Sequence, residues 1–341
     1  MLSKFKMPWV KQDYKYSCFQ KLAMNVLKQG IIPTHVAFIM DGNRRHATAH
    51  GLQKTEGHKQ GFSKLSEVLR WCYDFGVREV SVYAFSIENF KRSEGEVSFL
   101  MDLALNKLND LVQNKDELHK QGVRVRVLGN LRLLPIGVQR AAARIMLMTS
   151  ENFRATLNIL MSYTTRDELT TTLSTIRRGV QSGILKEEYA VTWDISPELI
   201  DKSSQLRGCR PLDLLVRTSG EVRLSDFMLW QASRSAALFS FFKVNWPAFS
   251  FWHLAAAILH FQLNRSALVP LPEAVRCHLN ELDSHNTANG HGGIYQPVTI
   301  DAINAENRTR RLAKFYASLE KEYMDELFEI ANLPEVDETS A

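Results

Sequence analysis

The sequence predicts an α/β protein in which helices flank a mostly parallel central sheet. Short apolar runs alternate along the chain with segments of helical spacing. Several of these runs are apolar on both faces, as is typical of parallel strands buried on both sides. The 341 residues are 45% hydrophobic and 23% charged, a globular composition that excludes a disordered, collagen-like or coiled-coil protein.

The predicted elements form a single α/β domain over residues 31–265, with no internal repeat. Its strands are expected at 35–40, 79–85, 123–128, 156–163, 212–218 and 236–242, and its helices at 61–75, 95–120, 137–150, 166–181 and 249–264. A linker follows over 266–303, where the Gly/Asn/His-rich run "DSHNTANGHGG" has no apolar period. Residues 304–341 are expected to form a late helix and an acidic tail.

Residues 1–30 are expected to contain an amphipathic basic helix. Six lysines and one aspartate occur here, and apolar residues recur at helical spacing at Phe19, Leu22, Ala23, Val26 and Leu27. Two interpretations stay open, a helix packed on its own domain and a helix that lies on a membrane surface. No apolar run is long enough to span a bilayer, and lysines interrupt the region where a signal peptide would be apolar.

Charge and cysteine content narrow the class of protein further. The net charge is +5, yet residues 301–341 carry five Lys/Arg and ten Asp/Glu, so the preceding body is basic. A basic body suits nucleic acid, anionic lipid or a small polyanionic substrate. We expect no nucleic-acid binding, because the pattern lacks a basic recognition helix.

The four cysteines make no CxxC pair, which favours reduced thiols in a cytosol-facing protein and indicates no zinc site.

The segment "HVAFIMDGNRRH" (35–46) indicates a phosphate site. A buried strand delivers Asp41 at its carboxyl end, where ligands bind in α/β sheets. Gly42 and Asn43 turn the chain, and Arg44 and Arg45 follow where a helix should start, so guanidinium groups and free backbone N–H groups would face a phosphate together. A lone carboxylate beside phosphate suits Mg²⁺. The alternative is a plain Asp-Gly turn with a solvated arginine pair.

Two further loops carry polar residues to the same edge of a parallel sheet. The loop after the strand at 79–85 contains Ser86, Glu88, Asn89 and Arg92, and the loop after 212–218 contains Arg217, Ser219, Glu221, Arg223 and Ser225. Single arginines are usually surface residues, but convergence on one edge indicates a cleft for two multiply charged phosphate groups. His58 and Lys54 precede the helix at 61–75 and are the further candidates near the phosphates.

Five blocks in order resemble the cis-prenyltransferase (undecaprenyl diphosphate synthase) family, and within it the eukaryotic dehydrodolichyl diphosphate synthase catalytic subunits. They are "HVAFIMDGNRR", "GHKQGF" (57–62), "VYAFSIENFKRS" (82–93), "RVLGNLRLLP" (126–135) and "RTSGEVRLSDFMLWQ" (217–231), and the resemblance runs from about residue 8 to 265. It implies the cis-prenyltransferase fold and repeated condensation of isopentenyl diphosphate onto an allylic diphosphate such as farnesyl diphosphate. The product would be dehydrodolichyl diphosphate for dolichol synthesis and protein glycosylation.

The resemblance also implies a role for each matching residue. Asp41 would be the carboxylate linked to Mg²⁺. The allylic diphosphate would lie against Gly42, Asn43, Arg44, Arg45 and His58, while Ser86, Asn89 and Arg92 would flank the reacting centre, and Arg217, Arg223 and Ser225 would hold isopentenyl diphosphate. The helix at 95–120 is the expected wall of a tunnel for the growing hydrocarbon chain, with simple core packing as its alternative.

Three departures from the bacterial homodimeric members predict a heteromer. Ala236 stands where those members carry a second metal-linked glutamate, and Lys54 stands where they carry an arginine. No RxG motif follows residue 265. The resemblance implies that an accessory subunit of the Nogo-B receptor type supplies it, against 236–264 or the late helix, and that this chain alone is weakly active or inactive. Because the product is insoluble in water, peripheral attachment to the cytosolic face of the endoplasmic reticulum membrane is expected.

Two other functions remain as alternatives. The first is a non-catalytic partner subunit of such a complex, which would have lost the DGNR-type site that is intact here. The second is a phosphohydrolase with Asp41 as nucleophile, which would usually need a second acid where Asn43 stands.

Overall fold

The structure is a computed structural model that describes residues 14–186, 194–267 and 298–334. The chain folds into two compact units. The first contains residues 1–165, 210–268 and 327–341, and the second contains 166–209 and 269–326. The predicted boundaries at 1–30, 31–265, 266–303 and 304–341 stay predictions, and most of the proposed linker lies outside the described residues.

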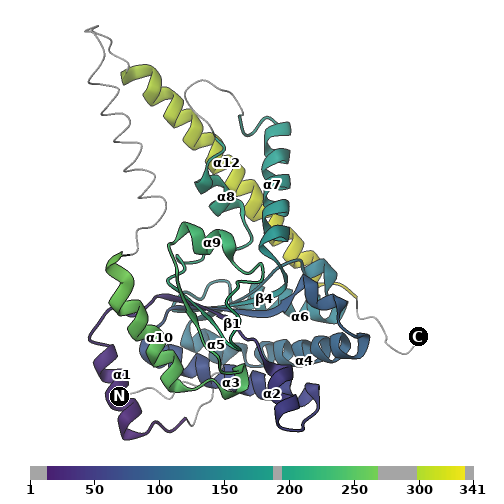
Figure 1. Cartoon of the computed structure of the whole chain (residues 1–341). Helices are drawn as coiled ribbons and strands as arrows, with labels where there is room; N and C mark the ends of the chain where they lie inside the picture. The colour runs from purple at the N-terminus through teal and green to yellow at the C-terminus, as the bar shows by residue number, and fades with distance from the viewer. Residues whose placement is uncertain (1–13, 187–193, 268–297, 335–341) are drawn as a thin grey trace. The chain divides into compact units, whose positions relative to one another are not determined.

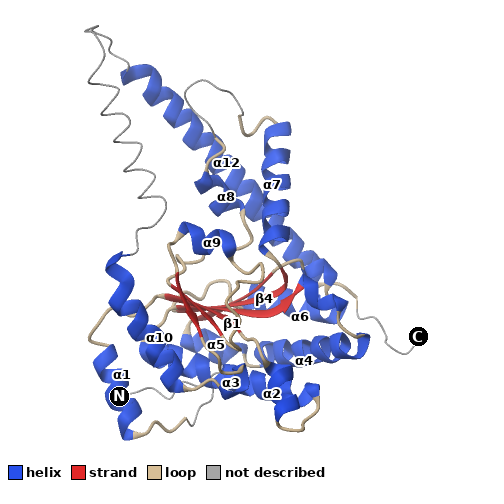
Figure 2. Cartoon of the chain, viewed as in Figure 1, coloured by secondary structure: helices blue, strands red, loops and turns tan. Residues whose placement is uncertain are grey.

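A six-stranded sheet forms the centre of the first unit, in the order β3-β4-β2-β1-β5-β6, and every pairing is parallel (Figure 2). Its strands are β1 (His35–Ile39), β2 (Glu79–Ser86), β3 (Val123–Leu128), β4 (Ala155–Tyr163), β5 (Leu214–Arg217) and β6 (Leu238–Phe241). All five residues of β1 and all four of β5 are buried, which explains why these runs lack polar alternation. The predicted α/β class, the parallel sheet and all six strands are confirmed.

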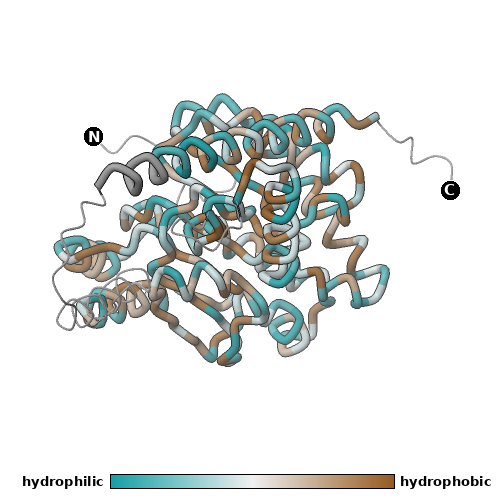
Figure 3. The backbone as a smooth tube through the Cα atoms, turned by 90° about the horizontal axis from the view of Figure 1, so that it is seen from above, coloured by the Kyte–Doolittle hydropathy of each residue, from teal (hydrophilic) through white to brown (hydrophobic). Residues whose placement is uncertain are grey.

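Helices cover this sheet, and Figure 1 shows α3, α4 and α10 on one side of it and α9 on the other. Figure 3 shows hydrophobic and hydrophilic positions alternating along the helices, as expected when one side of a helix packs and the other meets water. The helices of the first unit are α1 (Cys18–Leu27), α2 (Asn43–Ala49), α3 (Lys54–Phe75), α4 (Glu94–Gln113), α5 (Lys115–Gln121), α6 (Ile136–Met148), α9 (Leu229–Arg234) and α10 (Phe251–Asn264).

The predicted helices are confirmed with changed ends. The helix expected at 95–120 is two helices, α4 and α5, because the chain leaves helical geometry at Asn114. The helix expected from residue 61 begins at Lys54. Its first turns were not predicted because Gly57 and Gly61 have low helix propensity. These two glycines are needed where α3 meets α2: a Cβ at Gly61 would lie 2.2 Å from Asn43 Oδ1, and one at Gly57 would lie 2.3 Å from the Asn43 carbonyl oxygen.

The N-terminal helix α1 packs on the first unit but leaves much of its apolar side outward. Met24 is buried, Gln262 of α10 donates to the Leu27 carbonyl over 2.7 Å, and Lys28 Nζ donates to the Asp74 carbonyl over 2.8 Å. Phe19, Leu22 and Val26 are exposed by 75%, 62% and 61%. No helix among the described residues is long and apolar enough to cross a bilayer.

The second unit is helical and has a small core of its own. It holds α7 (Thr165–Gln181), α8 (Pro197–Ser203) and most of α12 (Val298–Ala331), the predicted late helix. Ile176, Leu185, Leu199 and Phe315 form its buried cluster. The fully buried Asp194 accepts hydrogen bonds from Arg311 Nε and a terminal nitrogen of the same guanidinium over 2.9 and 3.0 Å, which fixes α12 to the loop before α8.

The cysteines that the structure describes, Cys18, Cys72 and Cys209, are free thiols, whereas Cys277 lies outside the described residues. Cys72 is buried, and burial raises the pKa of its thiol.

Candidate active site

Asp41 stands just beyond the carboxyl end of β1, held by its backbone. Its carbonyl oxygen accepts hydrogen bonds from Trp246 N over 3.0 Å and from Thr218 Oγ1 over 2.7 Å. Gly42 follows at φ 101°, and a Cβ there would lie 2.5 Å from Asn245 Oδ1, so only glycine fits this turn. The sharp turn starts α2 immediately after the carboxylate, as the "DGNRR" segment predicted.

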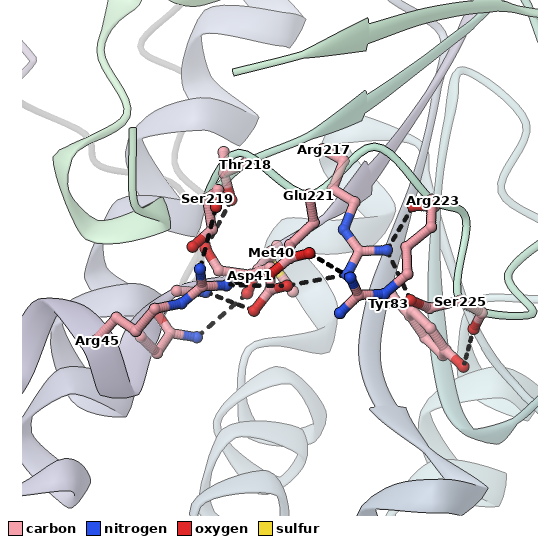
Figure 4. Close-up of polar contacts among 12 residues, drawn as sticks. Met40, Asp41, Arg45, Tyr83, Arg217, Thr218, Ser219, Glu221, Arg223 and Ser225 are labelled. Carbon is pink, nitrogen blue, oxygen red and sulfur yellow. Dashed lines mark hydrogen bonds and ion pairs between the residues drawn. The ribbon is translucent and has the colours of Figure 1, made fainter. Parts of the chain in front are cut away.

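The Asp41 carboxylate is surrounded by donors from three parts of the chain (Figure 4). Oδ1 accepts a hydrogen bond from Gly42 N over 2.7 Å. Oδ2 lies 2.9 Å from an Arg217 terminal nitrogen and 3.6 Å from one of Arg45. In the sheet, Arg217 pairs with Ile39 of β1, which brings the ends of β1 and β5 together. The predicted convergence of Asp41 and Arg217 is therefore observed.

Arg217 also organises the loop that follows β5. Its side chain is only 4% exposed, and its other terminal nitrogen donates to Ser225 Oγ over 2.6 Å and to the Arg223 carbonyl oxygen. The Arg217 Nε atom is buried without a hydrogen-bond partner. A buried guanidinium held from both sides is a rigid cation at the sheet edge.

Glu221 links two exposed arginines at the rim. It lies 3.2 Å from an Arg45 terminal nitrogen and also pairs with Arg223. The Ser219 carbonyl accepts from Arg45 over 3.2 Å, so Arg45 spans from α2 to the β5 loop. Arg45 and Arg223 have side chains 51% and 63% exposed, which leaves both within reach of a soluble polyanion.

A second basic group gathers around Glu96 of α4. An Arg92 terminal nitrogen lies 2.8 Å from Glu96 Oε1, His58 Nε2 lies 3.5 Å from the same oxygen, and Arg44 lies 3.6 Å from Oε2. The Glu96 and His58 side chains are each 10% exposed. Two predicted diphosphate ligands, Arg44 and His58, and the predicted catalytic residue Arg92 thus share one carboxylate. Glu96 was not among the predicted site residues, although its i,i+4 spacing from Arg92 at a helix start was a usable signal.

Burial sets the protonation of this second group. Desolvation lowers the pKa of His58, and nearby Arg92 lowers it further, while Glu96 opposes the shift. His58 is therefore neutral at physiological pH. Desolvation also lowers the pKa of Arg92, and so does Arg44, while Glu96 and Asp41 act in the opposite direction.

Ser86 ends β2 and caps the turn η1 (Ile87–Lys91), which contains Asn89. Ser86 N donates to Asn89 Oδ1 over 3.1 Å, and Glu88 N donates to Ser86 Oγ over 3.2 Å, which closes a reciprocal cap. The two side chains hold the turn that presents Arg92. Lys54 is the first residue of α3 and is exposed, and Ala236 has φ 50° directly before β6.

The chain supplies a limited set of metal ligands. Among the described residues, no group of three His, Cys, Asp or Glu side chains could hold a metal ion. Asp41 alone combines a partly exposed carboxylate, 32% by side chain, with a position between the two basic groups. One carboxylate with free lone pairs fits a hard divalent cation whose remaining ligands are water and substrate oxygens. The donor set therefore fits a metal shared with phosphate, not one enclosed by protein.

This geometry defines an enzyme that handles two polyanionic groups around one carboxylate. Six arginine or histidine side chains come from α2, α3, the end of η1 and the loop after β5, in two sets, one of which contacts Asp41. They are Arg44, Arg45, His58, Arg92, Arg217 and Arg223.

Comparison with known proteins agrees with this class. Residues 39–268 match the family model of the undecaprenyl diphosphate synthases. The chain is 46% identical to a dehydrodolichyl diphosphate synthase complex subunit from Homo sapiens, over 77% of this chain and 76% of that one. It is 38% identical to a geranylgeranyl-diphosphate-specific tritrans,polycis-undecaprenyl-diphosphate synthase from Pyrococcus abyssi, over 72% and 90% of the two chains. A crystal structure of lavandulyl diphosphate synthase from Lavandula x intermedia superimposes with a TM-score of 0.62 and 27% identity, over 68% and 95% of the two chains.

The chain therefore belongs to the undecaprenyl diphosphate synthase family of cis-prenyltransferases, as its motifs predicted. It is a prenyltransferase whose substrates are isoprenyl diphosphates, and this family uses a divalent metal.

Proposed function

We propose that this chain is the catalytic subunit of a long-chain cis-prenyltransferase that condenses isopentenyl diphosphate repeatedly onto farnesyl diphosphate. The product is dehydrodolichyl diphosphate, which serves dolichol synthesis and protein glycosylation. The observation that carries this proposal is the Asp41 carboxylate, 2.9 Å from the buried Arg217 and set between two basic groups that could each hold one diphosphate. Similarity to the human complex subunit supports the same substrate class.

Each substrate has its own set of ligands. Gly42, Asn43, Arg44, Arg45 and His58 hold the allylic diphosphate, and Arg217, Arg223 and Ser225 hold isopentenyl diphosphate. Arg92 flanks the reacting centre, and Arg45 joins the two sets, because it also contacts Glu221 of the loop after β5. In each cycle the bond between the allylic carbon and its diphosphate oxygen breaks, and the diphosphate leaves with the electron pair. The π electron pair of isopentenyl diphosphate forms the new carbon–carbon bond to the allylic carbon. C2 of the isopentenyl unit then loses a proton to the released diphosphate, and its electrons form the new cis double bond.

The arginines act on the charge that develops during this step. Negative charge accumulates on the leaving diphosphate as the bond breaks, and fixed cations already in place lower the barrier without reorganisation. Mg²⁺ would be held by Asp41 with diphosphate oxygens, and when bound it stabilises this charge as a Lewis acid. Ser86 and Asn89 cap the turn that aims Arg92 at the reacting centre.

The helix α4 supports a hydrocarbon-binding wall. Met101, Leu108 and Leu111 are buried as ordinary core, but Phe99, Leu100, Leu103 and Leu105 are only partly buried. A helix that served the core alone would bury these side chains. We assign the partly buried set to contact with the growing isoprenoid chain.

The other two functions fit this site less well. A non-catalytic subunit would have no use for the set of oriented arginines around Asp41. A phosphohydrolase that uses Asp41 as nucleophile would usually need a second acid two positions on, and Asn43 stands there.

A partner subunit of the Nogo-B receptor type is part of this proposal, because the sequence lacks the RxG motif after residue 265. The edge of the sheet supports such a contact. β6 is the last strand of the sheet in the described part of the chain, and it presents Phe239, 37% exposed, beside a stacked Phe241. An apolar strand edge favours burial against another chain.

Peripheral attachment to the cytosolic face of the endoplasmic reticulum membrane is also proposed. The exposed Phe19, Leu22 and Val26 lie on one side of α1, and α10, which contacts α1, adds the exposed Leu259 and Leu263. Apolar side chains beside lysines are typical of helices that lie in a bilayer interface. Co-sedimentation with liposomes tests this attachment. The double variant Phe19→Ser, Leu22→Ser and a deletion of residues 1–28 should each abolish binding to liposomes. Undiminished binding of both variants would disprove the attachment.

The function is tested by incorporation of labelled isopentenyl diphosphate with farnesyl diphosphate and Mg²⁺. We expect long-chain product from this chain with its partner, little from the chain alone, and none from Asp41→Ala with the partner. Robust activity of the chain alone would contradict the heteromer. Absence of activity in every pairing would contradict the catalytic assignment.

A further inference from the structure

The loop between β5 and α9 has a strained backbone at the residues that face the site. Four of its residues other than glycine have positive φ angles: Ser219 at 78°, Ser225 at 51°, Asp226 at 59° and Met228 at 50°. Side chains disfavour this left-handed region, so such a conformation persists only when surrounding contacts impose it. This loop contains Arg223 and Ser225, and both contact Arg217. The contacts that hold the loop therefore also position these three residues.

Tyr83 of β2 provides one restraint. Its hydroxyl shares one proton between two acceptors, the Tyr163 carbonyl oxygen at 3.0 Å and the Ser225 carbonyl oxygen of the loop at 3.3 Å. Figure 4 shows Tyr83 beside Ser225. Its ring stacks on Phe227, with centroids 4.5 Å apart and planes 19° apart, and Phe227 is fully buried. The β2–β4 pairing shifts register between Tyr83 and Phe85, and such irregularities re-aim side chains next to active sites.

Thr165, the first residue of α7, provides the second restraint. Its N–H and Oγ1 both donate to the Asp226 carbonyl oxygen, over 2.8 and 3.1 Å. The same Oγ1 accepts from Leu229 N over 3.0 Å. Thr165 is 3% exposed, so these bonds form away from water. They fasten the two ends of the segment 226–229, where two of the four positive φ angles occur.

We propose that Tyr83 and Thr165 are positioning residues that clamp the strained loop so that Arg217, Arg223 and Ser225 face the homoallylic diphosphate before it binds. This inference rests on the proposed function, and it assigns roles to two residues outside the motif residues that would bind substrate. Neither side chain needs to touch substrate. Burial raises the pKa of Tyr83 to about 12, so its hydroxyl keeps the proton that it donates.

The clamp acts on one substrate, which makes it testable by kinetics. Tyr83→Phe and Thr165→Val each remove hydrogen bonds to the loop and keep the shape of the side chain. In the complex with its partner, each should raise KM for isopentenyl diphosphate about fivefold, which corresponds to about 1 kcal/mol for a lost hydrogen bond. KM for farnesyl diphosphate should change by less than about twofold, because only Arg45 among its proposed ligands contacts the loop, while Arg44 and His58 are held by Glu96.

Two control variants separate positioning from a general loss of stability. Thr165→Ser keeps the hydroxyl and should behave as wild type. Tyr73→Phe makes the same change at a tyrosine of α3 that is 42% exposed and lies outside the loop, and it should change neither KM. A parallel rise of both KM values, or wild-type kinetics in Tyr83→Phe and Thr165→Val, would overturn the proposal.

A measurement without turnover distinguishes this inference from the proposed function. Amide hydrogen exchange over 219–229 should become faster in Tyr83→Phe and Thr165→Val than in wild type, while exchange over 35–45 stays the same. If the wild-type complex incorporates no isopentenyl diphosphate, the proposed function fails, and the exchange result still decides whether the clamp exists. Unchanged exchange over 219–229 refutes the clamp whatever the activity.

Discussion

Replacing Glu96 by glutamine tests whether one buried carboxylate holds the allylic half of the site. Its oxygens lie 2.8 Å from Arg92, 3.5 Å from His58 and 3.6 Å from Arg44, and its side chain is 10% exposed. The glutamine amide keeps the shape of the side chain but removes its charge. The charge-assisted hydrogen bond from Arg92 is then lost, and Arg92 and Arg44 lie near one another without a counter-charge. Arg44 is half exposed, so its ion pair with Glu96 contributes little to stability. Loss of the hydrogen bond to Arg92 should therefore lower the unfolding free energy of Glu96→Gln by about 2 kcal/mol.

Urea unfolding with and without inorganic diphosphate measures this effect. Glu94→Gln is the matched control, because Glu94 lies in the same first turn of α4 but is exposed, and it should cost less than about 0.5 kcal/mol. Diphosphate should stabilise Glu96→Gln more than it stabilises wild type, because the bound anion replaces the missing charge. Equal losses in the two variants, or equal stabilisation by diphosphate in Glu96→Gln and wild type, would refute the reasoning.

Three further outcomes are expected. Gly61→Ala should lower the unfolding free energy by about 1–3 kcal/mol and reduce activity, because its Cβ would lie 2.2 Å from Asn43 Oδ1, whereas Gly95→Ala on the open side of α4 should do neither. Asp41→Asn should abolish isoprenoid synthesis in the assay above and remove the dependence of diphosphate binding on Mg²⁺, measured by calorimetry. The unfolding free energy should fall as pH drops below about 6.5, because burial lowers the pKa of His35 and the unfolded chain then binds more protons. His35→Gln should flatten this slope, which is at most about 1.4 kcal/mol per pH unit for one group, and an unchanged slope would contradict it.

Much of the site could be predicted because parallel strands deliver their following loops to one edge. The runs at 35–40 and 212–218 were predicted as strands of one parallel sheet, which puts Asp41 and Arg217 at the same edge. The structure adds that β1 and β5 are neighbours, so that Asp41 Oδ2 lies 2.9 Å from Arg217. The grouping of the arginines into two sets could not be predicted, because it depends on Glu96 and Glu221. These two carboxylates look in the sequence like ordinary surface charges.

Local pattern also left the N-terminal helix undecided between packing on its domain and lying on a membrane. The structure shows that α1 does pack, through Met24 and the bond from Gln262, yet directs Phe19 and Leu22 outward. An amphipathic period gives the angular width of an apolar face but not which part of that face a neighbour covers. That depends on α10, more than 200 residues away along the chain.

The sequence by itself determined the parallel α/β fold, the sheet edge where the polar loops meet and the residue types proposed to bind diphosphate, because apolar period and strand direction are local properties. Only the tertiary structure decided which carboxylate neutralises which arginine, why Gly61 must lack a side chain, and how Tyr83 and Thr165 hold the strained loop. These are contacts between residues far apart in the chain, and their distances follow from the packing of the whole sheet and its helices.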